Sequence, residues 1–341
     1  MLRRLVVAIA AALLLAATAP ASTQPLGLAA DNHPTSVEVK ARPIPAFDQR
    51  DRTHLRFGKL HFRSGLILTS SYRSFGGLSS LRLDAGGGRF VAASDKGTWF
   101  TGRIVYRGSE MTGLADVEAA PMLAGDGRPL AAHRWYDTES MARDGGTVYV
   151  GIERVNRIVR FDFGRDGVRT RAEVVAVPPA LRGLPYNRGL EAMVVAPRGS
   201  RLAGALVAIS ERGLDPHGNI LGFLIGGPSP GTFTVRRRDG YDISDAALLP
   251  GGGDLLLLER KFSLVDGVGI RIRRIPLAGI APGAVIDGPS IFDADLGQEI
   301  DNFEGLATHL TPEGETVVTL VSDDNFSALQ RTLLLQFTLV D

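Results

Sequence analysis

Cysteine is absent from the 341 residues, and lysine occurs four times, as Lys40, Lys59, Lys96 and Lys261. The missing thiols exclude disulfides, thiolate nucleophiles, iron–sulfur clusters and Cys-ligated zinc. An excess of one charge is also lacking, because 38 basic residues stand against 37 acidic residues. A formal charge of +1 gives no electrostatic reason for nucleic-acid binding, and we expect none.

Long apolar runs are scarce, and the clearest one lies at the start of the chain. Two arginines precede an apolar run over residues 5–19, and Ala19-Pro20-Ala21 follows it. This pattern predicts a signal peptide over residues 1–21, too short to span a bilayer comfortably, in a periplasmic or secreted monomer. Without cysteine no lipid can be attached at the cleavage site, so we expect no membrane anchor. Residues 22–48 are predicted to be an exposed lead-in, followed by a single domain over residues 49–341.

Internal repetition is the main structural signal. The chain has 41 Gly, 19 Pro and 44% apolar residues, which predicts a sizeable core with many tight turns. Five segments share a polar key residue followed by an apolar strand, and the key residues are spaced 60, 52, 54 and 59 apart. The five key residues are Ser79, Glu139, Glu191, Asp245 and Glu304. A period near 50 residues is typical of propeller blades.

A second signature recurs downstream of each key residue. A strand there ends in an acid, and the five acids are Asp95, Glu153, Glu211, Glu259 and Asp323. We therefore predict an all-β propeller of five four-stranded blades. The fifth unit lacks an outer strand, so the N-terminal residues 55–70 should join it and close the ring. Six blades are an alternative if residues 113–136 or 285–299 hold a degenerate unit, and two stacked β-sandwiches are another.

The key residues predict an acidic ring, because the innermost strands of a propeller line its central channel. Carboxylates brought together there must take up protons, pair with arginine or bind a cation. Calcium suits such oxygen ligands, whereas six His without metal-binding spacing make zinc a poorer fit. We therefore predict a calcium site, and the residues predicted to hold the ion are Glu139, Glu191, Asp245, Glu304 and Asp323. A purely structural role for this ring stays open.

For the second ring of acids a structural role is favoured. Four of the five acids are followed by a base, and alternation along a strand sends that base to the other face. Lys96, Arg154, Arg212 and Arg260 can then pair with acids of the neighbouring blade.

Residues 76–79, 137–141, 189–193, 301–306 and 321–326 together resemble an exported bacterial family described as esterase-like activity of phytase, or phytase-like domain proteins. The resemblance extends from about Phe57 to Asp341. It implies a β-propeller related in shape to calcium-dependent alkaline phytases, with a phosphoric-ester hydrolase activity.

The expected chemistry follows from that resemblance and the ring. Calcium would neutralise phosphate oxygens and activate water, and Arg154, Arg212 or Arg260 would hold the phosphate. Glu304 is the expected general base or principal ligand, with Glu139 and Glu191 as further catalytic residues. The few scattered lysines favour a small phosphoester over an inositol phosphate. A calcium-dependent lactonase-type propeller and a non-catalytic binding propeller are the alternatives.

Overall fold

Antiparallel hairpins build the fold, because strands of alternating apolar and polar residues follow one another across short Gly-rich turns. The computed structural model describes residues 33–263 and 267–340, so the predicted signal peptide lies outside the described residues. Gly251 and Gly252 show the turn chemistry. Both have positive φ, of 93° and 71°, between two strands, and this conformation favours glycine.

The strands form five separate sheets. The first contains β5 (Leu78–Leu83), β6 (Arg89–Ser94), β7 (Thr98–Arg107), β8 (Glu110–Pro121) and β1 (Thr35–Ser36). The second contains β9 (Thr138–Asp144), β10 (Thr147–Ile152), β11 (Arg157–Asp162) and β12 (Glu173–Val175). The third contains β13 (Leu190–Val195), β14 (Leu206–Leu214), β15 (Ile220–Ile225), β16 (Gly231–Val235) and β20 (Val285–Ile286).

The remaining two sheets complete the ring. The fourth contains β17 (Asp242–Leu248), β18 (Asp254–Ser263), β19 (Gly267–Pro276) and β21 (Ser290–Asp295). The fifth contains β22 (Asn302–Leu310), β23 (Thr316–Asp323), β24 (Thr332–Leu339), β4 (Leu60–Thr69) and β2 (Lys40–Ile44), with β3 (Arg56–Phe57) beside β4. The described α-helices are single turns, α2 (Phe163–Asp166) and α3 (Pro179–Arg182). No helix in the described part of the chain is long and apolar enough to cross a membrane.

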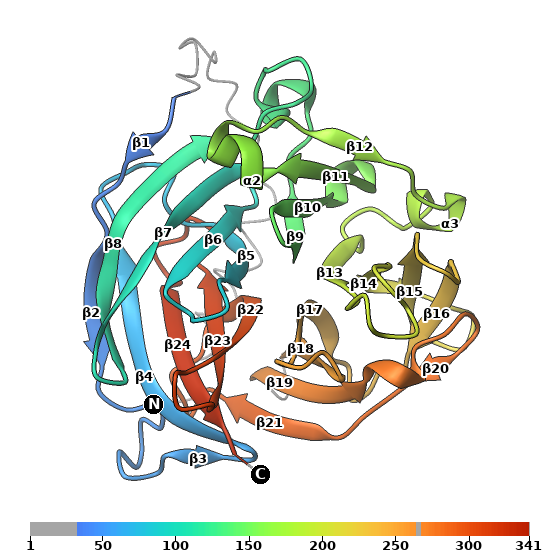
Figure 1. Ribbon diagram of the computed structural model, residues 1–341. Coiled ribbons are helices and arrows are strands. Elements are labelled where there is room, and N and C mark those ends of the chain that lie inside the picture. The colour runs from blue at the N-terminus through green and yellow to red at the C-terminus, as the bar shows by residue number, and fades with distance from the viewer. Residues whose placement is uncertain (1–32, 264–266, 341) are drawn as a thin grey trace, which may run out of the picture. The chain divides into compact units, whose positions relative to one another are not determined.

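The sheets are arranged around one axis, with β5, β9, β13, β17 and β22 innermost (Figure 1). Each innermost strand contacts the next, and β22 contacts β5, so the ring is closed. The predicted five-bladed β-propeller is confirmed. Residues 113–136 and 285–299 form no sixth blade. Their strands β8, β20 and β21 complete the first, third and fourth sheets.

The ring closes as predicted, through an N-terminal strand in the last blade. β4 pairs antiparallel with β24, and β2 covers the outer edge of β4. The prediction that residues 22–48 form an exposed lead-in is wrong for Val37 and for residues 44 and 46–48, which are buried. Phe47 is fully buried and packs edge-on against Phe57 and Phe337, at ring-centroid distances of 4.8 and 5.1 Å. The end of the segment, with Ile44 and Phe47, therefore belongs to the core between the fourth and fifth sheets.

The apolar core consists of five clusters, one between each pair of neighbouring sheets. Between the first and second sheets, for example, Trp99 packs edge-on against Phe161 at 5.1 Å. This packing fixes each innermost strand relative to its neighbours. It therefore holds the polar side chains near the axis in defined positions.

Candidate metal centre

A β-bulge near the start of each innermost strand prepares the site. The pairing with the next strand slips by one residue in every sheet, and a single residue is left unpaired there. A bulge bends the strand and redirects the side chain of the extra residue. The bulged residues are Ser79, Glu139, Glu191, Ser244 and Glu304.

A second equivalent position lies on the neighbouring strand, one residue beyond the bulge. In the first three sheets the backbone N–H of this residue donates to the carbonyl two residues before the bulge, as from Glu211 to Gly189 at 2.7 Å. The residues at this position are Asp95, Glu153, Glu211, Arg260 and Asp323. The two sets together bring most of the predicted acids to one mouth of the central channel.

Blade four departs from the sequence prediction by one residue. Ser244 is bulged instead of Asp245, because Ile243 pairs with Glu259 and Asp245 pairs with Leu258. Asp245 is not brought to the mouth. Its carboxylate lies fully buried, ion-paired with Arg82 at 2.8 Å, and also accepts from the backbone N–H of Leu306 and Ala246. These bonds occupy both oxygens, so the prediction of Asp245 as a metal ligand is corrected.

Glu259 is displaced by the same shift. It is buried and forms a bidentate ion pair with buried Arg273 of β19. The structural role predicted for the second ring therefore holds at Glu259. Arg260 takes the place at the mouth that an acid occupies in the other four blades.

The closest group of acids lies between the second and third blades. Glu153, Glu191 and Glu211 each place a carboxylate oxygen within 4.8 Å of the others. Glu191 is 4% exposed, and its side chain has no hydrogen bond or ion pair within the described part of the chain. Glu153 accepts one bond, from the backbone N–H of Gly189 at 2.7 Å. A buried carboxylate without a partner is costly, and a bound cation would remove that cost.

The other half of the mouth is also rich in acids. Glu139 is half-buried and has no hydrogen bond or ion pair among the described residues. One oxygen of Asp95, Oδ1, is buried without a partner. Asp323 is buried and accepts from the backbone N–H of Asn325 at 2.6 Å. Glu304 is buried, ion-paired with Arg260, and accepts from Asn302 at 2.8 Å.

Burial and mutual repulsion perturb these carboxyl groups strongly. Burial, followed by the charge of Glu304, raises the pKa of Asp323 to about 8. Burial raises the pKa of Asp95 to about 6 against the opposing charge of Lys96. Burial and neighbouring carboxylates also raise the pKa of Glu139 and of Glu191 well above the usual range. The mouth therefore favours protons or another cation.

Arg260 provides a guanidinium within this group. It ion-pairs with Glu304, donates to Asn302 at 2.6 Å, and reaches Glu211 at 3.5 Å. Burial opposes the charged form, but the carboxylates of Glu304, Glu191 and Glu211 raise the pKa of Arg260. These contacts occupy the guanidinium. Arg260 is thus tied to carboxylates at the position where a phosphate-binding role was predicted.

The other two predicted phosphate-binding arginines lie nearer the rim. Arg212 is ion-paired with Asp242 at 3.2 Å. Arg154 is partly exposed, stacks over Tyr136 at 4.2 Å, and donates to the hydroxyl of Tyr186 at 3.1 Å. Of the three arginines, Arg154 is the one not tied to a carboxylate at short range, since Asp137 lies 3.8 Å away.

Arg82 and Asp245 close the channel behind the mouth. The Arg82 guanidinium donates to one backbone carbonyl from each innermost strand. The acceptors are Leu81, Met141, Met193, Ala246 and Leu306. Beyond Arg82, at the other end of the innermost strands, lies a cavity of about 460 Å³. The sequence signal for this plug is Arg82 itself, a charged residue between the apolar strand residues Leu81 and Leu83. It was not singled out from the sequence.

The sequence model of a known family covers the whole mouth. This phytase-like family, described as "Esterase-like activity of phytase", matches residues 73–326. Every carboxylate of the mouth falls within the matched range. No curated protein matches the chain.

Solved structures with the same general architecture are distant. A glutaminyl cyclase from Myxococcus xanthus is 11% identical with a TM-score of 0.42, over 90% of this chain and 100% of the other. A PQQ-bound aldose sugar dehydrogenase from Streptomyces coelicolor is 13% identical with a TM-score of 0.39, over 90% and 99%. The Cps50 (Swd1) β-propeller domain of Myceliophteria thermophila is 13% identical with a TM-score of 0.35, over 74% and 67%. At these scores none of them bears on the chemistry of the site.

Proposed function

The chain belongs to the phytase-like family, and we propose that it is an exported, calcium-dependent phosphoric-ester hydrolase that uses the carboxylate mouth as its metal site. The signal-peptide pattern of residues 1–21, which lie outside the described part, supports export to the periplasm or beyond. The absence of excess positive charge supports a small-molecule substrate in preference to nucleic acid.

One observation carries the metal assignment. Glu153, Glu191 and Glu211 converge within 4.8 Å, and Glu191 is buried without a partner among the described residues. The donors at this point are carboxylate oxygens, which suit a hard ion of flexible coordination such as calcium. Glu153, Glu191 and Glu211 would hold the ion, and Glu139 lies near enough for its charge to act on Glu191.

Residues of the chain would supply the general base and bind the phosphate. A bound divalent cation would neutralise phosphate oxygens and lower the pKa of bound water. Glu139 is the best-placed general base of the three predicted catalytic carboxylates, because it is partly exposed and has no hydrogen-bond partner in the described ranges. Glu304 is less suited, since Arg260 and Asn302 already occupy its Oε1. Arg154 at the rim would donate its guanidinium N–H groups to the phosphate.

The test is a panel of substrates on the purified protein. Phosphomonoesters, phosphodiesters and lactones are offered with calcium and with a chelator. We expect phosphoester turnover that the chelator abolishes and that Glu139→Gln lowers at least 100-fold. Glu118→Gln, at an exposed position of strand β8, should leave the turnover unchanged. Turnover of lactones alone would replace the phosphoester assignment by the lactonase type. No turnover of any compound would leave a binding propeller.

A further inference from the structure

We propose that Arg260 is a built-in cation that fills a second metal position, so that the mouth binds one divalent ion where its acids would otherwise hold two. The inference rests on the proposed metal site, because it concerns how many ions that site accepts. It names Glu304 and Asn302 as oxygen ligands of the position that the guanidinium now fills, with Glu211 shared between this position and the first ion.

The register of blade four is the first support. Strand pairing puts Arg260 opposite Asp242, as Asp323 lies opposite Asn302 in blade five. Asp95, Glu153 and Glu211 stand at the same position in the other blades. One blade of five therefore presents a positive side chain where the others present a carboxylate, and this side chain points into the same mouth.

The contacts of Arg260 are the second support. Its guanidinium joins acids from the blades on either side, Glu211 of the third and Glu304 of the fifth. It also donates to the amide oxygen of Asn302 at 2.6 Å, and the amide nitrogen of Asn302 donates to Glu304 at 2.8 Å. Carboxylate and amide oxygens in this arrangement are ligands that a hard cation takes from proteins.

The unequal charge of the mouth is the third support. Glu191 is 4% exposed and has no hydrogen bond or ion pair among the described residues, although it feels the Arg260 charge. The guanidinium satisfies Glu304 and Glu211 but leaves Glu191 without a direct partner. A single divalent ion held by Glu153, Glu191 and Glu211 completes the neutralisation that Arg260 begins. Removing the Arg260 charge frees the oxygens of Glu304, Asn302 and Glu211 that the guanidinium now contacts for another ion.

The experiment counts calcium ions. Calorimetric titration of metal-free protein with calcium chloride, supported by metal analysis of protein purified in calcium, is run on wild type, Arg260→Met, Arg260→Gln and Arg260→Lys. We expect one ion in wild type and in Arg260→Lys, which keeps the cation, and two in Arg260→Met and Arg260→Gln. Arg143→Met is the matched control, because Arg143 lines the cavity at the other end of the channel and removing it changes net charge equally.

The outcomes separate this inference from the proposed function. One ion in wild type and one in both neutral variants overturns the inference and leaves the calcium site intact. Two ions in wild type also overturns it, because Arg260 would then fill no metal position. No calcium in any protein overturns the proposed metal site and the inference together. If Arg260→Met fails to fold, Arg260→Gln and metal analysis of calcium-purified protein decide the count.

Discussion

At the scale of single residues, charged side chains near the axis are of two kinds: those with all their bonds made, and acids without a partner. Arg82 and Asp245 satisfy each other and five backbone carbonyls, so they form a closed structural plug. Glu191 and Glu139 have no such partners in the part of the chain that the structure describes. A residue with every bond made contributes to stability, whereas a buried acid with none is poised for a cation.

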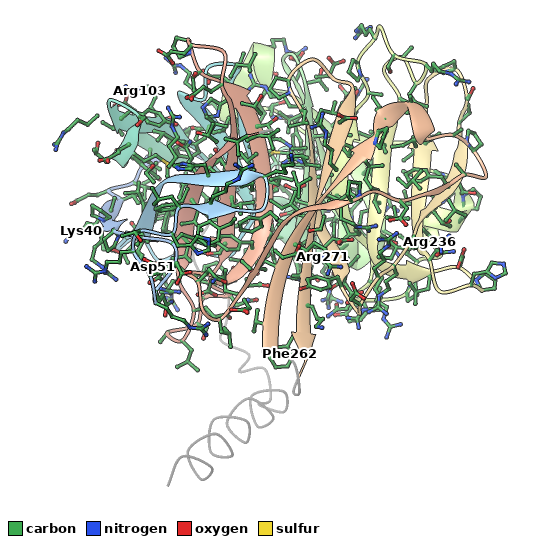
Figure 2. All side chains as sticks on the ribbon, turned by 90° about the horizontal axis from the view of Figure 1, so that it is seen from below. Lys40, Asp51, Arg103, Arg236, Phe262 and Arg271 are labelled. Atoms are coloured by element: carbon green, nitrogen blue, oxygen red, sulfur yellow. The ribbon has the colours of Figure 1, made fainter. Side chains whose placement is uncertain are left out.

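The plug predicts a large loss of stability for Arg82→Met. The substitution leaves Asp245 buried without its ion-pair partner, and breaking a buried pair costs about 3–5 kcal/mol. Chemical unfolding monitored by circular dichroism measures the loss. The control is Arg103→Met, because Arg103 lies at the surface (Figure 2). Its exposed ion pair with Asp116 should contribute under about 1 kcal/mol. Equal costs for the two variants would show that Arg82 is not a plug.

The unpartnered acid predicts a different response for Glu191→Gln. The neutral side chain removes a buried charge, so we expect the metal-free variant to be at least as stable as wild type near pH 8. Calcium should raise the melting temperature of wild type and leave that of the variant nearly unchanged. Thermal unfolding with calcium and with chelator measures both. A calcium-dependent rise of the same size in the variant would exclude Glu191 as a ligand.

At the scale of elements, the last blade depends on a segment from the start of the chain. Phe47 lies among the aromatic rings between the fourth and fifth sheets, where it contacts Phe57, Phe62, Phe292 and Phe337. Phe47→Ala should therefore lower the free energy of unfolding by about 3–5 kcal/mol. Phe262→Ala is the matched control, because Phe262 is 69% exposed on β18 (Figure 2). Similar small effects for both would mean that this segment does not hold the ring closed.

The elements also show how far sequence alone leads. The repeat predicted five blades and the N-terminal closure, because apolar alternation and turn residues are local signals. The same pattern could not fix the register of blade four. Residues 243–247 contain a single acid, Asp245, and matching acid to acid shifted the alignment by one residue. Since a one-residue shift moves a side chain to the other face of a sheet, Asp245 and Glu259 were misassigned and Arg260 was overlooked as the fifth member.

A metal-binding role for Glu153 and Glu211 of the second ring was not predicted from the sequence, for a related reason. Glu153 and Glu211 were expected to be structural because each is followed by an arginine. Their distance to Glu191 depends on how two blades pack together, and no pattern within one repeat reports that. The buried charge of Arg82 was also unassigned, because its acceptors come from all five blades.

At the scale of the whole molecule, the mouth links stability to pH. Burial raises the pKa of Asp95 to about 6 and that of Asp323 to about 8, above an unfolded value of 3.8. Between the unfolded value and these raised pKa values, the folded protein binds more protons than the unfolded chain. The contribution of the two groups to the free energy of unfolding is therefore fully present below about pH 4 and is lost as pH rises through the folded pKa values. We expect the free energy of unfolding of metal-free protein to fall by a few kcal/mol from pH 5 to 8, at roughly 1.4 kcal/mol per pKa unit and group.

Calcium should remove only part of that fall, because the ion is held by Glu153, Glu191 and Glu211, whereas Asp95 and Asp323 lie in the other half of the mouth. Chemical unfolding at pH 5, 6, 7 and 8, with calcium and with chelator, tests the linkage. Metal-free stability that rises across this range would contradict the raised pKa values of the mouth.

The most direct test of the carboxylate mouth as a metal centre is a crystal structure of the protein soaked in calcium, with anomalous scattering used to locate the ion. We expect an anomalous peak at the mouth, coordinated by carboxylate oxygens of Glu153, Glu191 and Glu211. A peak elsewhere, or these three side chains free of metal at saturating calcium, would contradict it.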